Sequence, residues 1–241
     1  MTGPELPDHV VRLDQGEPFS FLCHQQIDCF THCCRELELA LTPYDVLRLR
    51  QATRLDSAEL LEKYIIIEQN PEDIFPRFYL TMVDDGKASC VFIQQDGCSI
   101  YQHRPGACRT YPMGRAAIRE KGKLEEFFVL LHEPHCHGFA EQTIQTIDSY
   151  SRAQGLESYN RYNDMLTEIT QHEKIRQGMR LDNKQVQTYS LALYDIDTFR
   201  ASLKKGALMG AEDAPVTVFS NDEALLEYAM KWLERELFPI P

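Results

Sequence analysis

Apolar residues in the second half of the chain recur at intervals of three and four positions. Tyr162, Met165 and Ile169 show this spacing, which is the period of a helix that buries one face. The pattern predicts long amphipathic helices over residues 141–154, 156–174, 184–204 and 224–237. We expect this half to serve as a helical scaffold, because no residue type in it requires a substrate-binding role.

Shorter elements are predicted in the first half of the chain. Thr42 can cap a helix that begins at Pro43, because its hydroxyl accepts a backbone N–H and proline suits the first helical position. Ser57 begins a second helix, whose apolar series runs through residues 60–65. Alternating apolar residues bounded by turn residues predict two hairpins. Their strands cover residues 78–83 and 88–93, joined by a turn at 84–87, and residues 116–119 and 124–131, joined by a turn at 121–123.

The order of these elements predicts an α+β fold that is predominantly helical. We expect residues 1–140 to form a cysteine-cluster metal-binding region with short hairpins. Residues 141–241 are expected to form the helical scaffold, packed against the first region as one globular unit. With 43% hydrophobic residues, the chain can bury a substantial core without disulfides.

Charge and hydropathy argue against two kinds of partner. The net charge of −12 argues against nucleic acid, because binding a phosphate backbone needs clustered Lys and Arg. No run of roughly 18 apolar residues predicts a membrane span, and the N-terminus has no cationic stretch followed by an apolar one. We therefore expect a cytoplasmic protein, where thiols stay reduced and clustered cysteines are metal ligands or redox groups more often than disulfides.

Eight cysteines lie in the first 136 residues of the chain, and none follows. Thiolates prefer zinc, copper(I) and iron–sulfur clusters to hard cations such as magnesium, because polarizable sulfur matches those ions. This distribution predicts a soft-metal site. The candidate metal ligands are Cys23, Cys29, Cys33, Cys34, Cys90, Cys98, Cys108 and Cys136.

The adjacent cysteines Cys33 and Cys34 indicate how eight thiols divide. Neighbouring side chains point about 100° apart on a helix, or to opposite faces of a strand, so the two cannot easily serve one small ion. Two four-thiolate sites follow, with Cys33 in one, Cys34 in the other and the later cysteines completing both. The alternative uses four cysteines as ligands and leaves the others structural or redox-active.

Spacing between the cysteines bears on which metal they hold. Structural zinc sites usually contain two cysteines separated by roughly two to four residues, and only Cys29 and Cys33 meet that spacing. A multi-iron cluster accepts ligands that are spread more widely. An iron–sulfur cluster is therefore slightly favoured as the cofactor, and zinc stands close behind.

Arginines and histidines near the cysteines are further candidates for the site. Arg104 and Arg109 flank Cys108 and could donate hydrogen bonds to the thiolates that bind the cofactor. A surface arginine is the alternative for each. The histidine-rich run at residues 132–137 could supplement a thiolate, although eight cysteines already supply two complete ligand sets.

Three segments carry a resemblance to a known family: FLCHQQIDCFTHCCR, CVFIQQDGCSIYQHRPGACRTYP and HCHGF. They resemble the CxxxCxxCC (YkgJ-like) cysteine-cluster family, whose members are described as zinc- or iron-chelating domains. The match covers roughly residues 19–139, and its first motif has wider gaps between cysteines than is usual in the family. The second segment is the most specific, with matching positions at Cys90, Gly97, Cys98, Ile100, Tyr101, Arg104, Pro105, Cys108, Arg109, Tyr111 and Pro112.

The resemblance implies metal binding rather than a particular reaction. One relative with such a motif, the flagellin lysine N-methylase, has cysteines associated with an iron–sulfur cluster, and this supports iron–sulfur here. The methylase activity does not carry over, because the chain shows no glycine-rich pocket for a methyl donor.

Three functions agree with these residues. The first is a metal-binding protein whose cysteines hold an iron–sulfur cluster, zinc or one of each, in a structural or electron-transfer role. The second is a cluster-dependent oxidoreductase, or an enzyme that modifies a protein or a small molecule. The third is a device for metal trafficking or redox sensing, in which the metal is weakly held and exchangeable.

Overall fold

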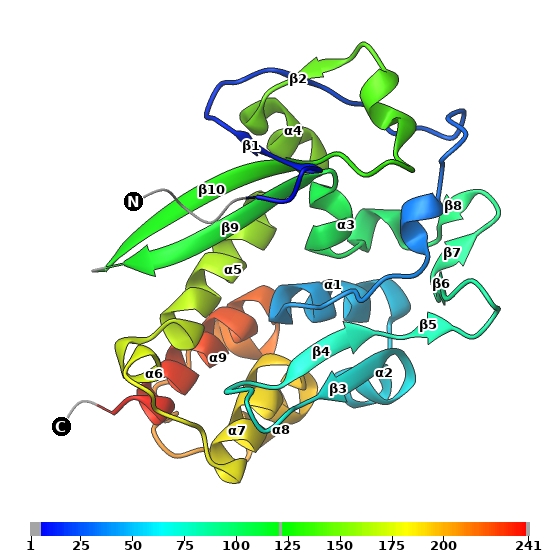
Figure 1. The fold of residues 1–241 in the computed structure, drawn as a ribbon. Coiled ribbons are helices and arrows are strands. Elements are labelled where there is room, and N and C mark those ends of the chain that lie inside the picture. Colours follow the sequence, from blue (N-terminus) through cyan, green and yellow to red (C-terminus); the bar gives the residue numbers. More distant parts are fainter. Residues whose placement is uncertain (1–5, 121, 240–241) are drawn as a thin grey trace. The chain divides into compact units, whose positions relative to one another are not determined.

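The computed structural model describes residues 6–120 and 122–239. It is 43% helical and 18% strand, and its strands form several small antiparallel sheets (Figure 1). This composition is consistent with the predicted α+β class. Within the described residues, no helix is long and apolar enough to cross a membrane.

Contacts divide the chain into two compact units, each built from two stretches of sequence. The cysteine unit consists of residues up to 37 and residues 82–159, and it contains all eight cysteines. The second unit consists of residues 38–81 and the residues from 160 onwards. The predicted domain boundary at residue 140 stays a prediction; the compact units divide the chain at other points.

A three-stranded antiparallel sheet forms one side of the cysteine unit (Figure 1). Strands β9 (Met113–Glu120) and β10 (Lys123–Leu131) form its hairpin, and β1 (Val10–Leu13) pairs with the other edge of β10. The predicted hairpin is confirmed. Its turn includes Lys121, which lies outside the described residues, and Gly122, whose φ of 77° is in the left-handed region that glycine adopts readily.

The core of the cysteine unit lies between this sheet and helix α4 (Ile147–Gln154). Thr146 caps α4 by accepting the backbone N–H of Ser149. Two partly buried side chains, Cys136 and Phe139, pack against the core and thereby join it to the sulfur region. The buried core residues are Leu13, Phe19, Phe21, Met113, Phe128, Leu130, Ile147, Tyr150 and Leu156.

The predicted helix over residues 141–154 is wrong in its first part. Residues before α4 form a short 3-10 helix, η3 (His137–Ala140), and strand β11 (Ile144–Gln145), which pairs with β2 (Phe19–Ser20). The backbone N–H of Phe21 donates to the carbonyl of Thr143 at 3.0 Å. This long-range pairing takes the place of the helical hydrogen bonds that the periodicity predicts.

Short elements carry most of the cysteines. The predicted turn at residues 84–87 does join two paired strands, β5 (Met82–Val83) and β6 (Ser89–Cys90). The predicted strand bounds of 78–83 and 88–93 are wrong, because residues 77–80 pair with residues 65–68 and residues 93–94 pair with residues 97–98. A smaller hairpin follows, formed by β7 (Ile93–Gln94) and β8 (Gly97–Cys98). The remaining elements of this region are η1 (His32–Cys34), η2 (Tyr101–His103) and α3 (Gly106–Thr110).

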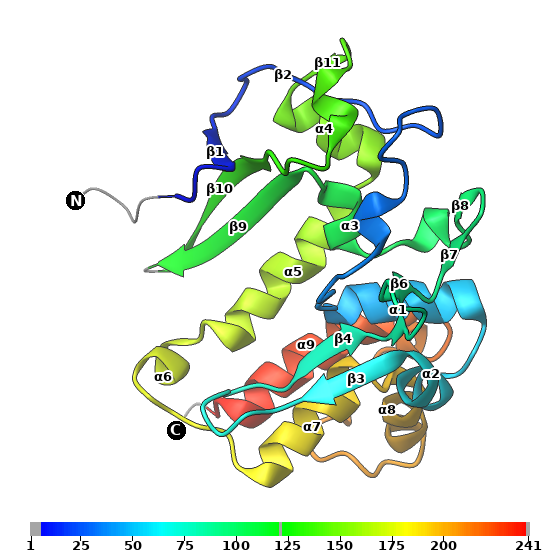
Figure 2. The ribbon, with the colours of Figure 1, turned by 45° about the vertical axis from the view of Figure 1, so that its right-hand side comes forward.

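In the second unit, helices α1 (Pro43–Thr53) and α2 (Ser57–Tyr64) begin where the sequence predicts. The Asp45 carboxylate accepts the Thr42 backbone N–H at 2.8 Å, which completes a capping box at the start of α1. Ile65 was expected in α2 and instead begins strand β3 (Ile65–Glu68), because a run of β-branched side chains favours extended backbone. Figure 2 shows β3 beside its partner β4 (Arg77–Leu80).

Two of the predicted long helices are interrupted. Helix α5 (Glu157–Thr170) ends before α6 (Glu173–Arg176), where the His172 ring accepts the N–H of Lys174. The expected helix over residues 184–204 is divided into α7 (Asn183–Leu193) and α8 (Ile196–Lys204) because Asp195 caps a new helix. The chain continues with η4 (Val216–Phe219) and α9 (Asp222–Leu237).

Ion pairs join the helices of the second unit. Arg50 on α1 donates to Asp197 at 2.6 Å and to Asp222 at 2.8 Å, and Arg200 binds the same two carboxylates. Asp197 also accepts the backbone N–H of Ser57, which is the first residue of α2. One partly buried carboxylate therefore connects α1, α2 and α8.

We expect Asp197→Asn to lower the free energy of unfolding by about 2 kcal/mol at neutral pH, because hydrogen bonds to charged groups are lost. Burial opposes ionisation of Asp197, yet its bonds with Arg50 and Ser57 hold its pKa below the usual value. The carboxylate thus stabilises the fold above the unfolded pKa of roughly 3.9, and this contribution is lost as pH falls through the folded pKa.

Urea unfolding at several pH values measures this effect. The difference between wild type and Asp197→Asn should shrink as the solution is acidified below about pH 4. Glu62→Gln, at an exposed position of α2, is the matched control and should change stability by less than about 0.5 kcal/mol. Equal effects of the two substitutions would contradict the role given to Asp197.

Candidate metal centre

All eight cysteines are free thiols, and all of them belong to the cysteine unit. Cys23 and Cys108 are exposed, Cys29 is buried, and the others are half-buried. The cysteines come from segments far apart in the sequence, so their grouping depends on long-range contacts. The predicted ligand residues are therefore together in one compact unit, as a metal centre requires.

Contacts join the N-terminal segment to residues 136–138, and we name the cysteines of this region the first sulfur set: Cys23, Cys29, Cys33 and Cys136. The Cys29 sulfur accepts the backbone N–H of His137 at 3.2 Å, directly after Cys136. The N–H of Leu22 donates to the carbonyl of Gly138 at 3.1 Å, which holds Cys23 in the same region.

Electrostatic coupling supports this first sulfur set. Burial, followed by the charges of Cys33, Cys29 and Cys136, raises the pKa of Cys23 to about 11. The pKa of Cys136 is raised chiefly by burial, and Cys29 and Cys33 add to the increase. The charges of Cys29 and Cys33 therefore act on both Cys23 and Cys136.

A second sulfur set consists of Cys34, Cys90, Cys98 and Cys108. The pKa of Cys34 is raised by the thiol of Cys33 and by burial, and then by the charges of Cys108 and Cys90. Burial is also the main cause that raises the pKa of Cys90, with a contribution from Cys98. These couplings connect the four cysteines in a chain from Cys34 to Cys98.

Backbone contacts bring the second set together. The N–H of Glu36 donates to the carbonyl of Ala88 at 3.0 Å, which places the segment after Cys34 beside β6. Gly97 has a φ of 117°, and a Cβ there would lie 3.2 Å from the ring of Phe30. Glycine is required at this position because both the backbone angle and the close approach of Phe30 disfavour a side chain.

The two sets meet at the adjacent cysteines Cys33 and Cys34. Their thiols share a hydrogen bond, which lowers the pKa of Cys33 to about 7 and raises that of Cys34. The Cys33 thiolate is thus the acceptor and the Cys34 thiol the donor. A metal that took either sulfur would break this hydrogen bond, so the metal-free pair holds a proton that ligation must remove.

Backbone amides point to several of the sulfurs. The N–H groups of Phe92 and Ile93 donate hydrogen bonds to the Cys90 sulfur. The N–H of Ile100 donates to Cys98, and the N–H of Gly138 donates to Cys136. Each one lowers the pKa of its thiol, although burial raises the pKa of all three overall. Amide hydrogen bonds favour the charged thiolate, which is the form that binds a metal.

The residues fit a soft metal by donor chemistry. Within residues 6–120 and 122–239, no three His, Cys, Asp or Glu side chains already stand in a geometry that could hold an ion. A thiol turns about a single side-chain torsion, so each sulfur can reorient without a change in its own backbone. Thiolates in sets of four suit zinc or an iron–sulfur cluster.

Arg104 lies in the interior of the cysteine unit, with 8% of its surface exposed. Its guanidinium donates to the carbonyl of Tyr101 at 2.7 Å and to the side chain of Gln154 at 2.5 Å. Burial lowers the pKa of Arg104, and the charges of Cys108 and Cys98 oppose this shift. The charge of Arg104 lowers the pKa of Cys23. A hydrogen bond from Arg104 to thiolates stays a prediction, because the hydrogen bonds of its guanidinium go to Tyr101 and Gln154.

Arg109 is equally buried but binds backbone rather than sulfur. Its guanidinium donates to the carbonyls of Gln102, Arg104 and Gln154. These bonds hold the loop before α3 against the end of α4. A direct interaction of Arg109 with thiolates stays a prediction. Its hydrogen bonds to backbone carbonyls stabilise the local fold.

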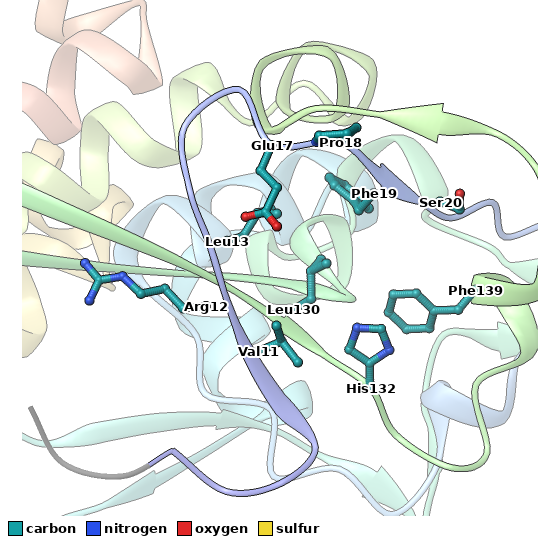
Figure 3. A pocket seen from close by; sticks show the side chains of 10 residues that line it. All are labelled: Val11, Arg12, Leu13, Glu17, Pro18, Phe19, Ser20, Leu130, His132 and Phe139. Atoms are coloured by element: carbon teal, nitrogen blue, oxygen red, sulfur yellow. The ribbon is translucent and has the colours of Figure 1, made fainter.

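The histidines after β10 have other partners. The His132 ring stacks on Phe139 with 4.0 Å between ring centres, and His135 lies 3.5 Å from the Glu133 carboxylate. Figure 3 shows the rings of His132 and Phe139 side by side, and Arg12 extending away from them. Both rings line a hollow of about 330 Å³ beside β1.

A larger hollow of about 620 Å³ opens onto both sulfur sets. Cys23 of the first set and Cys98 of the second set line it, together with the exposed ring of Tyr101. Its volume is within the range of small-molecule sites. Sequence reasoning did not find this hollow, because its walls come from residues about 70 positions apart.

Two contributors to the site were missed from the sequence. Glu133 raises the pKa of Cys33 through its charge, and Gln154 holds the guanidinium of Arg104. Burial and the neighbouring Cys136 and Glu133 raise the pKa of Tyr111, whose hydroxyl is buried without a hydrogen-bond partner of normal geometry. Glu133 could have been found by its place beside the histidines, whereas Gln154 gives no signal in the sequence.

Comparison with protein families identifies the sulfur-bearing part of the chain. Residues 22–137 match the CxxCxxCC family model, described as a "putative zinc- or iron-chelating domain". The matched residues lie within the span in which the sequence resembles the CxxxCxxCC family. All eight cysteines fall inside the matched residues, so the resemblance found in the sequence is confirmed. Searches of curated proteins and of solved structures found no match to the chain.

Zinc affinity of the metal-free protein should rise with pH by more than about tenfold per unit near neutrality, because each ion displaces more than one thiol proton. The raised pKa values of the buried thiols keep protons on them in the absence of metal. Competition with a chromophoric chelator between pH 6.5 and 8, with calorimetry in two buffers of different ionisation enthalpy, measures the protons released. Affinity independent of pH would contradict ligation by these thiols.

Proposed function

We propose that the cysteine unit holds two metal centres with four thiolates each, in a structural or electron-transfer role. Cys23, Cys29, Cys33 and Cys136 supply the first centre. The ligands of the second centre are Cys34, Cys90, Cys98 and Cys108. The observation that carries this proposal is the pairing of backbone segments that brings Cys23 and Cys29 to Cys136 and places the residue after Cys34 beside Ser89 and Cys90, with charge couplings between the thiols in support.

The proposal explains why two adjacent cysteines are both used. One tetrahedral ion takes four ligands, so eight thiols in one unit exceed the need of a single centre. The Cys33 and Cys34 thiols share a hydrogen bond without metal, and each would turn away from the other to join its own set when metal binds. The short 3-10 helix η1 carries both residues and joins the two centres covalently.

An iron–sulfur cluster is our first choice for at least one centre, and zinc is the alternative. Cysteine spacing in the second set is wide, with Cys90, Cys98 and Cys108 on separate elements. Backbone N–H groups directed at sulfur are among the means by which proteins set cluster potentials. Free thiols in a domain that chelates metal also support the cytoplasm as its compartment.

A second candidate function is a cluster-dependent oxidoreductase or modification enzyme. The hollow of about 620 Å³ favours it, because one thiol from each set lines the same space. A small molecule held there would lie beside both centres. A reversible redox signal that changes when small ligands are added would support this candidate, and colourless protein that contains only zinc would count against it.

Metal analysis with a visible absorption spectrum tests the proposed function. Protein purified without oxygen should contain iron with inorganic sulfide, or zinc, in amounts that fill two centres. Brown protein with broad charge-transfer absorption identifies iron–sulfur, and colourless protein with zinc identifies the alternative. Metal-free protein with eight intact thiols would disprove the proposal, and metal that exchanges readily with a weak chelator would favour trafficking or sensing instead.

Substitution of the two adjacent cysteines should separate the centres. We expect Cys33→Ser to lose the first centre and Cys34→Ser to lose the second, because each removes one of four ligands. Cys23→Ser and Cys98→Ser are matched variants that should reproduce the two losses from other segments. Metal content of each protein checks the result; a single substitution that empties both centres, or neither, would contradict the division.

A further inference from the structure

We propose that Gly138 is a positioning residue that completes the first centre by letting the segment of Cys136 dock against the segment of Cys29. The inference rests on the proposed function and adds the contact that assembles one of its two sites. Cys23, Cys29 and Cys33 belong to one N-terminal stretch of the chain. Cys136 directly precedes η3 and reaches that stretch only in the folded protein.

Backbone hydrogen bonds hold η3 against the N-terminal stretch. The N–H of His137 donates to the Cys29 sulfur at 3.2 Å, and the N–H of Leu22 donates to the Gly138 carbonyl at 3.1 Å. One donor lies on each segment, so the two segments bind each other reciprocally. Bonds of this kind require the two segments to approach closely, and they form directly after Cys136.

Gly138 permits this close approach because it has no side chain. A Cβ at this position would overlap the ring of Phe21 and would lie 3.0 Å from the Leu22 carbonyl oxygen. The φ of Gly138 is outside the left-handed region, so its backbone angles would accept an alanine. Lack of space, and not backbone strain, is therefore the reason for glycine here.

The Phe21 ring has no room to move away from Gly138. It is buried in the core of the cysteine unit and packs edge-to-face against the rings of Phe139 and Tyr150, with 5.3 Å and 6.1 Å between ring centres. The Phe21 N–H also donates to the Thr143 carbonyl at 3.0 Å, which fixes its backbone. Interiors packed in this way resist added atoms, so a side chain at position 138 would displace η3 and the cysteine before it.

Thiol labelling of the metal-free protein measures the docking directly. Cys29 is 7% exposed, so it should react slowly with an alkylating reagent in wild type. In Gly138→Ala it should react roughly tenfold faster, because overpacking makes η3 open more often and breaks the bond from His137. Cys90 on β6 lies outside the docking contact and should keep its wild-type rate. Peptide mass spectrometry after quenching gives the rate for each cysteine.

Zinc binding tests the role of Gly138 in the first centre. Metal-free protein is titrated with Zn²⁺ under reducing conditions against a chromophoric chelator, for wild type and for Gly138→Ala. The variant should retain one ion at wild-type affinity and bind the other at least roughly tenfold more weakly, because only the first centre uses Cys136.

Two further variants separate positioning from general stability. Adding Phe21→Leu to Gly138→Ala removes the outer ring atoms that the new Cβ meets, so it should restore part of the lost zinc affinity. Gly114→Ala is the matched control, because a Cβ there would lie 2.8 Å from the Val129 side chain in the β9–β10 hairpin. It should lower the melting temperature without changing zinc affinity or the reaction rate of Cys29.

The outcomes separate this inference from the proposed function. Wild-type protein that binds neither zinc nor iron would overturn both. If wild type binds two ions, the inference alone is overturned when Gly138→Ala binds both unchanged, weakens both equally, or leaves Cys29 as slow to react as in wild type. If Gly138→Ala fails to fold, wild type decides: the amides of Leu22 and His137 should exchange hydrogen slowly in the metal-free protein, and free exchange would contradict the docking.

Discussion

Pairing between distant backbone segments is the constraint on which the cysteine unit depends. Cys23 and Cys136 are far apart in the sequence, yet the bond from Leu22 to Gly138 and the bond from His137 to the Cys29 sulfur bring their segments together. The contact of Phe30 with Gly97 does the same for the first cysteine bunch and β8. Without these contacts the segments that carry the eight cysteines would not lie close together, and the thiols could not form a common site.

Buried arginines near the site have divided roles. Arg109 binds three carbonyls and braces the loop before α3, so its charge is used for architecture. Arg104 stacks on Tyr101 and donates to the Gln154 side chain, and the charges of Cys108 and Cys98 act on its guanidinium. The two residues are close in sequence and equally buried, and only their hydrogen-bond partners distinguish them.

Burial and hydrogen bonding act in opposite directions on the thiols. Burial keeps most of them protonated, whereas amide N–H groups at Cys90, Cys98 and Cys136 favour the thiolate. A bound soft metal would satisfy both effects. Its positive charge would replace the thiol protons, and the amide hydrogen bonds would then stabilise the bound thiolates. The arrangement agrees with the description of the matched family model, a "putative zinc- or iron-chelating domain".

The sequence by itself determined the chemistry of the site and the local elements. The soft ligands, the family motif, the cap of α1 at Thr42 and the β9–β10 hairpin all depend on neighbouring residues, so they can be read from spacing. Tertiary structure decided what depends on distant partners. It placed residues 137–145 in extended pairing rather than in a helix, ended α7 where Asp195 caps α8, and assigned Arg109 to carbonyls. Local periodicity cannot encode those choices, because the competing hydrogen bonds come from segments that meet only in the folded chain.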